Sequence, residues 1–207
     1  MIKALVIGEQ ASGKTSLCQT LPSFASKKGV KTLAINLAYL CKHITFTPAI
    51  DVRKEVKLSK SEAADEEKAF AKIAGNKKFW SKISSLDADL ILLDSDISLE
   101  RALLFGNPVL EKIDLILCVF NPKEALKEWV VKVHCRSLSE VNEKKVLCVI
   151  NEKQLFAKKR QPKLDSAFLE KNEWGEKTAD STGIELIRVS AIEKNGFGKL
   201  LEKITSE

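Results

Sequence analysis

One short stretch near the start of the chain constrains its fold more than any other. Residues 8–15 read Gly-Glu-Gln-Ala-Ser-Gly-Lys-Thr and directly follow the apolar run Ala4–Ile7. Glycines at both ends of a tight loop let backbone N–H groups surround an anion, and the helix that follows offers its positive N-terminus. Every fixed position of the pattern G-x-x-x-x-G-K-[ST] is occupied. The sequence therefore predicts a strand, a phosphate-binding loop (the P-loop) and a helix, in this order.

The P-loop predicts both a phosphate site and a Mg²⁺ site. We expect Lys14 to reach the β- and γ-phosphates of a nucleotide and the Thr15 hydroxyl to bind Mg²⁺. Asp94 ends the apolar run that starts at residue 89, and a carboxylate at such a strand end commonly holds the ion in proteins with this loop. The alternative is an aspartate that caps the next element. The residues predicted to contact the phosphates are Gly8, Ala11, Ser12, Gly13, Lys14, Thr15 and Ser16.

Apolar runs alternate with helical patterns along the rest of the chain. Strands are predicted at residues 1–7, 31–36, 89–94, 113–120, 144–150 and 185–189, and helices at 14–28, 59–74, 79–86, from 123 to about 134, and 196–204. Segment 37–53 is irregular, and segment 155–183 is poorly periodic and is expected to contain one or two short helices with loops. Such alternation favours one α/β domain, residues 1–207, with a mostly parallel sheet between two helical layers. The ligand is then expected at the carboxyl ends of the strands.

Composition excludes several other classes of protein. The formal charge is +6, but the lysines are interspersed with acids, so we expect no nucleic-acid partner. The densest basic stretch, Lys158–Lys163, is interpreted as a solvated loop, with a contact to an acidic partner as the alternative. Five cysteines without a C-x-x-C pair indicate a reducing compartment, and no apolar run approaches 18 residues. We therefore expect a soluble, cytoplasmic protein without a membrane partner.

With these pieces placed, the chain resembles the P-loop GTPases and, among them, most closely the GPN-loop GTPases. Besides the P-loop, the resemblance rests on Asn36-Leu37, on Pro48-Ala-Ile-Asp51-Val-Arg53 and on Leu93-Asp94. It implies a P-loop NTPase fold, GTP or GDP as ligand, Mg²⁺ as cofactor, and a homodimer or a heterodimer with a related GTPase. On the base side of the nucleotide it implies contacts from Asn151, Gln154, Ser190 and Ala191.

Four departures from the family pattern fall on positions that decide specificity and hydrolysis. Ala38 stands where the family has an aspartate, and Ile97 and Ser98 replace a glycine and a glutamine after Asp94. Gln154 replaces the aspartate that accepts two guanine N–H groups, and a neutral amide has only one acceptor oxygen there. Gly-Pro-Asn itself is absent. Gly75-Asn76 is either its remnant or an ordinary helix end.

Two functions of different classes follow from these patterns. The first is a Mg²⁺-dependent guanine-nucleotide-binding protein with weak or partner-dependent GTP hydrolysis, for which Asp51, Asp96 and Ser98 are the remaining candidates near the reacting phosphate. The second is a non-catalytic interaction or assembly protein that keeps nucleotide as a structural or regulatory ligand. An ATP-binding P-loop protein is a third, weaker alternative.

Overall fold

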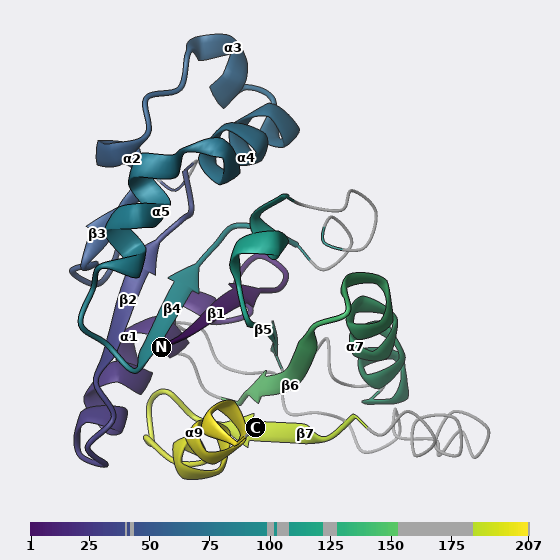
Figure 1. Ribbon diagram of the computed structural model, residues 1–207. Coiled ribbons are helices and arrows are strands. Elements are labelled where there is room, and N and C mark those ends of the chain that lie inside the picture. The colour runs from purple at the N-terminus through teal and green to yellow at the C-terminus, as the bar shows by residue number, and fades with distance from the viewer. Residues whose placement is uncertain are drawn as a thin grey trace.

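The computed structural model describes residues 1–39, 41, 44–98, 102, 108–121, 128–152 and 184–206. These residues form a seven-stranded sheet with helices on both faces (Figure 1). In chain order the elements are β1 (Ile2–Ile7), α1 (Lys14–Ser26), β2 (Thr32–Asn36), β3 (Ile50–Asp51), α2 (Val52–Glu55), α3 (Lys60–Ala63), α4 (Glu66–Gly75), α5 (Lys77–Ser84), β4 (Leu90–Asp94), the 3₁₀ helix η1 (Pro108–Lys112), β5 (Leu115–Phe120), α7 (Glu128–Asn142), β6 (Lys145–Asn151), β7 (Leu186–Val189) and α9 (Phe197–Thr205).

All of the strand pairs in the sheet are parallel, and their order is β3-β2-β4-β1-β5-β6-β7. The first strand therefore lies in the middle, between β4 and β5, with the P-loop at its carboxyl end. The strands β2, β3 and β4 lie on one side of β1, and β5, β6 and β7 lie on its other side. Parallel sheets bind ligands at the point where the strand order reverses in this way. The predicted α/β class and its mostly parallel sheet are confirmed.

Alternate residues of the central strands build two separate cores. Leu5 and Ile7 of β1 face one core, whereas Ala4 and Val6 face the other. Each side chain points to the opposite face from its neighbour because a strand has a period of two residues. Both faces are apolar because both are covered by helices, which explains why the strands read as unbroken apolar runs.

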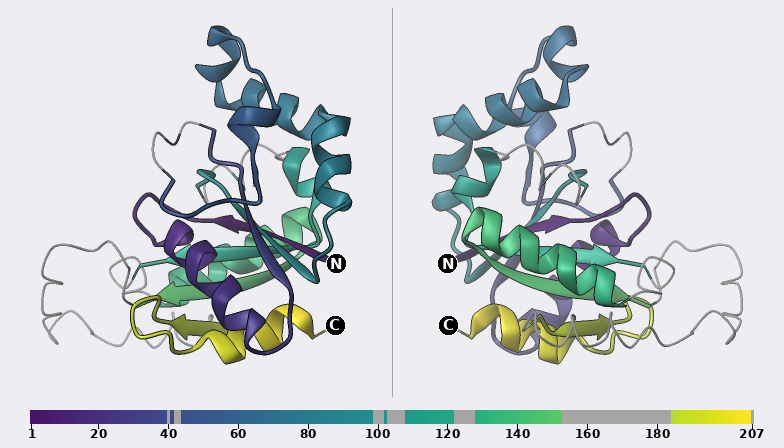
Figure 2. Two further views of the ribbon diagram at one scale, coloured as in Figure 1. Left: turned by 90° about the vertical axis from the view of Figure 1, so that its left-hand side faces the viewer. Right: turned by 90° about the vertical axis from the view of Figure 1, so that its right-hand side faces the viewer.

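The two helical layers differ in size. α1 and α9 cover one face, and Phe24 and Phe197 meet between them with ring centroids 5.9 Å apart. α4, α5, η1 and α7 contribute to the core on the other face. Figure 2 shows α3 and α4 beyond the ends of the strands. Within the described residues no helix has the length and apolar character needed to cross a bilayer.

The helix predicted over residues 59–74 is in fact two helices, α3 and α4. Ser59 begins α3 with a capping box, in which its hydroxyl accepts from the Glu62 N–H and the Glu62 carboxylate accepts from the Ser59 N–H. Asp65 then takes an extended conformation, and its carboxylate accepts from the N–H of Lys68 in the first turn of α4. A side chain that caps a new helix N-terminus interrupts a run of good helix formers here.

Other boundaries differ from the predicted ones. The segment predicted to be irregular after β2 contains β3 and the single turn of α2, and η1 was not predicted. α7 continues to Asn142, beyond the predicted end near His134, while α1 ends two residues before Lys28. Gly29 has a φ of 77°, as expected for a left-handed residue after a helix. Segment 155–183 lies outside the described residues.

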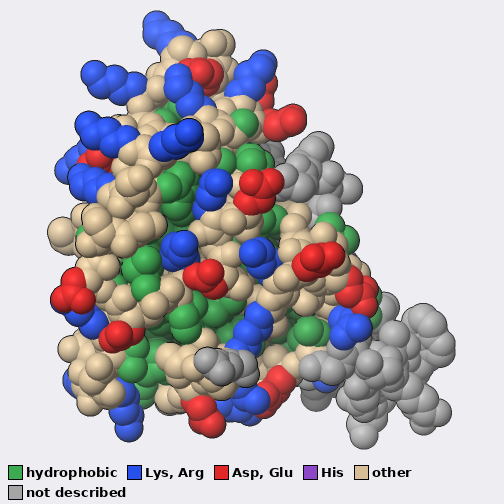
Figure 3. Space-filling view, viewed as in Figure 1, with side chains coloured by type: hydrophobic (Ala, Val, Ile, Leu, Met, Phe, Trp, Pro, Cys, Tyr) green, Lys and Arg blue, Asp and Glu red, His purple; other side chains and the backbone are tan. Residues whose placement is uncertain are grey.

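Charged side chains of both signs are scattered over the face drawn in Figure 3, between hydrophobic side chains. Several lysines on the helices α2 to α5 form ion pairs, among them Lys72 with Glu62 and Lys82 with Glu55. Exposed pairs of this kind contribute little to stability, about 0–1 kcal/mol each.

Candidate functional site

The backbone of the P-loop takes conformations that explain its two glycines. Gly8 has a φ of 144°, and a Cβ built on it would lie 2.2 Å from the carbonyl oxygen of Val119 on β5. Gly13 has a φ of 95° and immediately precedes α1. Between them, Ala11 also has a positive φ, of 62°. A loop with such conformations turns its amides inward, and this is the arrangement that binds anions.

Hydrogen bonds hold the loop in this shape. The Lys14 ammonium donates to the carbonyl oxygens of Gly8 and Glu9, at 2.7 and 2.9 Å, and the Ser12 N–H donates to the Glu9 carbonyl at 3.2 Å. Ser12 and Ser16 are buried. The cation of Lys14 thus lies against its own loop, at the N-terminal end of α1.

Thr15 and Asp94 bring two hard oxygen donors together. The Thr15 hydroxyl donates to Oδ2 of Asp94 at 2.8 Å. The other carboxylate oxygen of Asp94 is buried, and no described residue donates a hydrogen bond to it. Burial raises the pKa of Asp94 to about 6, although the Thr15 hydrogen bond and the Lys14 charge act to lower it. An orphaned buried oxygen beside a hydroxyl suits a divalent cation that prefers oxygen ligands.

The side chains here fit Mg²⁺ better than a metal ion whose ligands all come from the protein. Among the residues that the structure describes, no group of three or more His, Cys, Asp or Glu side chains is placed to hold a metal ion. Mg²⁺ is typically bound by one or two protein oxygens and completes its shell with water and substrate phosphates. Thr15 and Asp94 would supply those protein oxygens.

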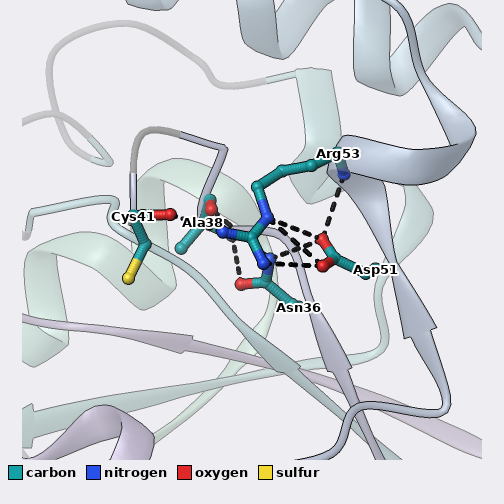
Figure 4. Close-up of polar contacts among 5 residues, drawn as sticks. All are labelled: Asn36, Ala38, Cys41, Asp51 and Arg53. Carbon is teal, nitrogen blue, oxygen red and sulfur yellow. Dashed lines mark hydrogen bonds and ion pairs between the residues drawn. The ribbon is translucent and has the colours of Figure 1, made fainter. Parts of the chain in front are cut away.

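A row of polar residues ends the strands next to β1. Asp51 of β3 pairs in register with Asn36 of β2, and Asn36 pairs in register with Asp94 of β4. The Asn36 amide donates to Asp51 at 2.9 Å and accepts from the Ala38 N–H at 3.1 Å (Figure 4). The N–H groups of Leu37 and Ala38 both donate to the backbone carbonyl of Asp94. The segment after β2 is therefore fixed beside the predicted metal ligand.

Arg53 forms an ion pair with Asp51 at the outer end of this row. Its Nη2 atom lies 2.7 Å from Oδ2 of Asp51, and its Nε donates to the same carboxylate. Burial acts to raise the pKa of Asp51, but hydrogen bonds from Arg53 and Asn36 outweigh it and lower the pKa to about 2. The second terminal nitrogen of Arg53 donates to the backbone carbonyl of Cys41 at 2.6 Å. Asp51 is thus an ionised, fully hydrogen-bonded carboxylate.

The segment after β4 packs tightly against the P-loop. The hydroxyl of the buried Ser95 donates to the Val6 carbonyl at 2.7 Å, and the Gly8 N–H donates to the Ile97 carbonyl at 3.1 Å. The Ile97 side chain is buried in the core. Asp96 and Ser98 lie half-buried on either side of it, and the charge of Asp96 contributes to the raised pKa of Asp94.

The predicted base-side residues meet the P-loop through Asn151. This fully buried side chain donates to the Gly13 carbonyl and accepts from the Ala191 N–H, each at 3.4 Å. Ser190 is also buried and accepts a hydrogen bond from the Glu193 N–H. The structure therefore brings residues 13, 151, 190 and 191 together. Gln154 lies outside the described residues.

Two contacts of the site were not predicted from the sequence. Arg53 was noted only as part of a pattern, although it connects Asp51 with the Cys41 carbonyl. The hydrogen bond from Gly8 to Ile97 joins two loops that follow neighbouring strands. The strand-end position of Asn36, Asp51 and Asp94 is the feature that could have revealed the polar row, since neighbouring parallel strands end at one edge.

Comparison with known proteins gives one family match and several structural matches. Residues 6–103, slightly less than half of the chain, match the family described as "Conserved hypothetical ATP binding protein". This stretch includes the P-loop, Asn36, Asp51, Arg53 and Asp94. No curated protein matches the chain.

Three solved structures illustrate the similarity in fold. The apo form of a GTPase from Pyrococcus abyssi is 17% identical, with a TM-score of 0.70 over 98% of this chain and 96% of that chain. The 54 kDa signal recognition particle protein of Aeropyrum pernix in complex with GDP is 15% identical, with a TM-score of 0.51, covering 98% of this chain and 49% of that one. The MinD cell division protein of Aquifex aeolicus is 19% identical, with a TM-score of 0.50, covering 98% and 90%.

At these identities the similarity concerns the fold alone. Together with the parallel sheet and the loop at the end of its central strand, it shows that this chain has the three-layer α/β fold of the P-loop NTPases.

Proposed function

We propose that this protein binds a guanine nucleotide with Mg²⁺ and is a divergent member of the GPN-loop GTPase family. The observation that carries the proposal is the contact between Thr15 and Asp94, which lies beside a P-loop whose Gly8 leaves no room for a Cβ. The two side chains place oxygen donors for a cation next to a loop that is shaped for phosphate. The family match over residues 6–103 supports nucleotide binding, and the similarity in fold to the P. abyssi GTPase supports a GTPase-like protein.

In this proposal Lys14 exchanges its two backbone carbonyl partners for the β- and γ-phosphates. The loop from Gly8 to Ser16 then surrounds the phosphates with N–H groups, and Thr15 and Asp94 hold Mg²⁺. Asn151, Ser190 and Ala191 contribute to the base side, together with Gln154. Asn151 suits this role because its amide joins the P-loop to the loop after β7.

Hydrolysis is expected to be weak or to depend on a partner. Phosphoryl transfer relies on a positioned water and on electrostatic stabilisation. Ala38 has no side chain that could position a water, and Ile97 is buried with its carbonyl directed to Gly8. Asp96 and Ser98 remain the candidates to orient water. The ion pair with Arg53 makes Asp51 a poorer proton acceptor, because its pKa is lowered to about 2.

A non-catalytic role is the second candidate, and a specific observation favours it. Ser95 and Ile97 fasten the segment after β4 to β1 and the P-loop through buried contacts, so this segment has little freedom to follow a γ-phosphate. A protein of this kind would hold nucleotide as a structural or regulatory ligand, as one half of a homodimer or of a heterodimer with a related GTPase.

The test is a titration of the purified protein with fluorescent GTP, GDP and ATP analogues in Mg²⁺, followed by phosphate release at saturation. We expect guanine nucleotides to bind, Lys14→Ala to abolish binding, and phosphate release to be slow or absent. Lys199→Ala is the matched control, because this lysine forms an exposed ion pair with Glu185 beside α9. Tighter binding of ATP would favour the third alternative, and no binding of any nucleotide would overturn the proposal.

A further inference from the structure

We propose that Arg53 is a positioning residue of the nucleotide site, which holds the segment after β2 in place and so maintains the Mg²⁺ end of the site. The inference rests on the proposed nucleotide function. In this role Arg53 acts through other residues and contacts neither the nucleotide nor Mg²⁺.

The first step is the geometry of Arg53 itself. One guanidinium group reaches two partners that belong to different segments, the Asp51 carboxylate at the end of β3 and the Cys41 carbonyl after β2. Asp51 keeps 7% of its side-chain surface exposed and Arg53 29%, so the pair is largely shielded from water. The planar guanidinium fork, with its several donors, makes both contacts at once.

The second step is the path from Arg53 to the predicted metal ligand. Asp51 accepts from the Asn36 amide, Asn36 accepts from the Ala38 N–H, and Ala38 donates to the backbone carbonyl of Asp94. These hydrogen bonds connect the ends of the neighbouring strands β3, β2 and β4. Arg53 closes this chain on its outer side by fixing Cys41, which lies three residues beyond Ala38.

The third step is the expected consequence for binding. When the Arg53 contacts are removed, the backbone at Ala38 and Cys41 loses its outer support, and the strand end that carries Asp94 becomes less well defined. Mg²⁺ requires near-ideal octahedral geometry and is therefore sensitive to such loosening. Nucleotide binding without Mg²⁺ depends mainly on Lys14 of α1 and on the amides of the P-loop, which follows another strand, β1.

The reactivity of the Cys41 thiol measures whether the contact between Arg53 and the Cys41 carbonyl is intact. Cys41 is the one half-buried cysteine, since Cys18, Cys118, Cys135 and Cys148 are buried. A maleimide should therefore modify Cys41 first, and mass spectrometry of the digested protein identifies the site. We expect Arg53→Gln to raise the rate of labelling at Cys41 by about tenfold or more, the effect of losing charge-assisted hydrogen bonds. Labelling of the four buried cysteines should stay unchanged.

The second measurement is nucleotide affinity with and without Mg²⁺ in the same variants. We expect Arg53→Gln to raise the Kd for the Mg²⁺ complex by about tenfold and to leave the Kd measured in EDTA within about twofold. Arg53→Lys keeps the charge but not the fork, so it should lie between wild type and Arg53→Gln in both assays. Arg136→Gln is the matched control, because Arg136 pairs with Glu140 on the surface of α7.

Different results overturn different statements. A wild-type protein that binds no nucleotide overturns the proposed function, and the coupling to Mg²⁺ with it. If wild type binds but Arg53→Gln has the same Mg²⁺-dependent affinity, the inference alone is wrong. Unchanged labelling of Cys41 in both Arg53 variants likewise overturns it. If Arg53→Gln exposes all five cysteines, the variant is unfolded, and the more conservative substitution Arg53→Lys decides by the same two criteria.

Discussion

Thr15 donates its hydroxyl hydrogen to Oδ2 of Asp94 at 2.8 Å, across 79 positions of sequence. This contact joins the first turn of α1 to the end of β4 and leaves the second Asp94 oxygen buried without a described donor. A carboxylate in such a place lowers the stability of the free protein. A cation bound to Asp94 would remove this loss of stability.

Asp94→Asn should therefore stabilise the free protein while it weakens Mg²⁺ binding. Burial raises the pKa of Asp94 to about 6, so at pH 7 the carboxylate is charged in an unfavourable environment. An amide keeps the acceptor for Thr15 and removes the charge. We expect the free energy of unfolding to rise by about 1–2 kcal/mol. Urea unfolding without Mg²⁺ measures this change, and a loss of stability would contradict it.

The matched effect on binding belongs to the same variant. Asp94→Asn should remove most of the increase in nucleotide affinity that Mg²⁺ produces in wild type. Isothermal titration with and without Mg²⁺ measures it, with Asp114→Asn as control because Asp114 is exposed and accepts from the Lys3 N–H at the opposite end of β1.

Gly8→Ala should destabilise the protein far more than Gly29→Ala. Both glycines have positive φ angles, of 144° and 77°, but the added Cβ meets the Val119 carbonyl at 2.2 Å at position 8 and no atom within 4 Å at position 29. We expect a loss of about 3 kcal/mol or more for Gly8→Ala and about 1 kcal/mol for Gly29→Ala. Thermal unfolding of the two variants side by side tests the difference, and equal losses would contradict the close contact.

Asp51 should make the stability depend on pH in the acid range. Its pKa is about 2 in the folded protein and its ordinary value is 3.8, so the unfolded chain binds the proton more readily. The stabilisation is complete above pH 3.8 and is lost as the pH falls through about 2. The difference in unfolding free energy between wild type and Asp51→Asn should shrink by about 2 kcal/mol from pH 5 to pH 2. A constant difference across this range would argue against a strongly ionised Asp51.

Ile97→Ala should loosen the segment after β4 without removing any ligand of the phosphates. The Ile97 side chain is fully buried, and its truncation leaves a cavity beside the P-loop. We expect a loss of about 2–4 kcal/mol in unfolding free energy. Hydrogen exchange of the Gly8 amide, which donates to the Ile97 carbonyl, should become faster. Unchanged exchange at Gly8 would show that the backbone contact does not depend on the buried side chain.

Sequence patterns were sufficient for the elements that are buried on both faces. The runs from Leu90 to Asp94 and from Leu115 to Phe120 are continuous and apolar, and few structures other than a buried parallel strand are compatible with them. The P-loop was placed for a related reason, since its glycine spacing has a specific backbone requirement. Both glycines, Gly8 and Gly13, have positive φ angles.

Other features depend on contacts that a sequence pattern does not encode. Asp65 divides α3 from α4 only because its carboxylate caps the second helix, whereas its neighbours all favour a helix. β3 has two residues, too few to show a period, and it exists through its pairing with β2. The Arg53 contact with Cys41 joins two residues that are 12 positions apart, a separation for which no spacing rule applies.

The central position of β1 also has a consequence for the order in which the chain can fold during synthesis. Leu5 pairs with Leu93 on one side and with Ile116 on the other, so β1 leaves the ribosome well before either of its neighbours in the sheet. Contacts of such long range form slowly. The P-loop, although it is encoded before β4 and β5, therefore acquires its shape only after both strands have emerged.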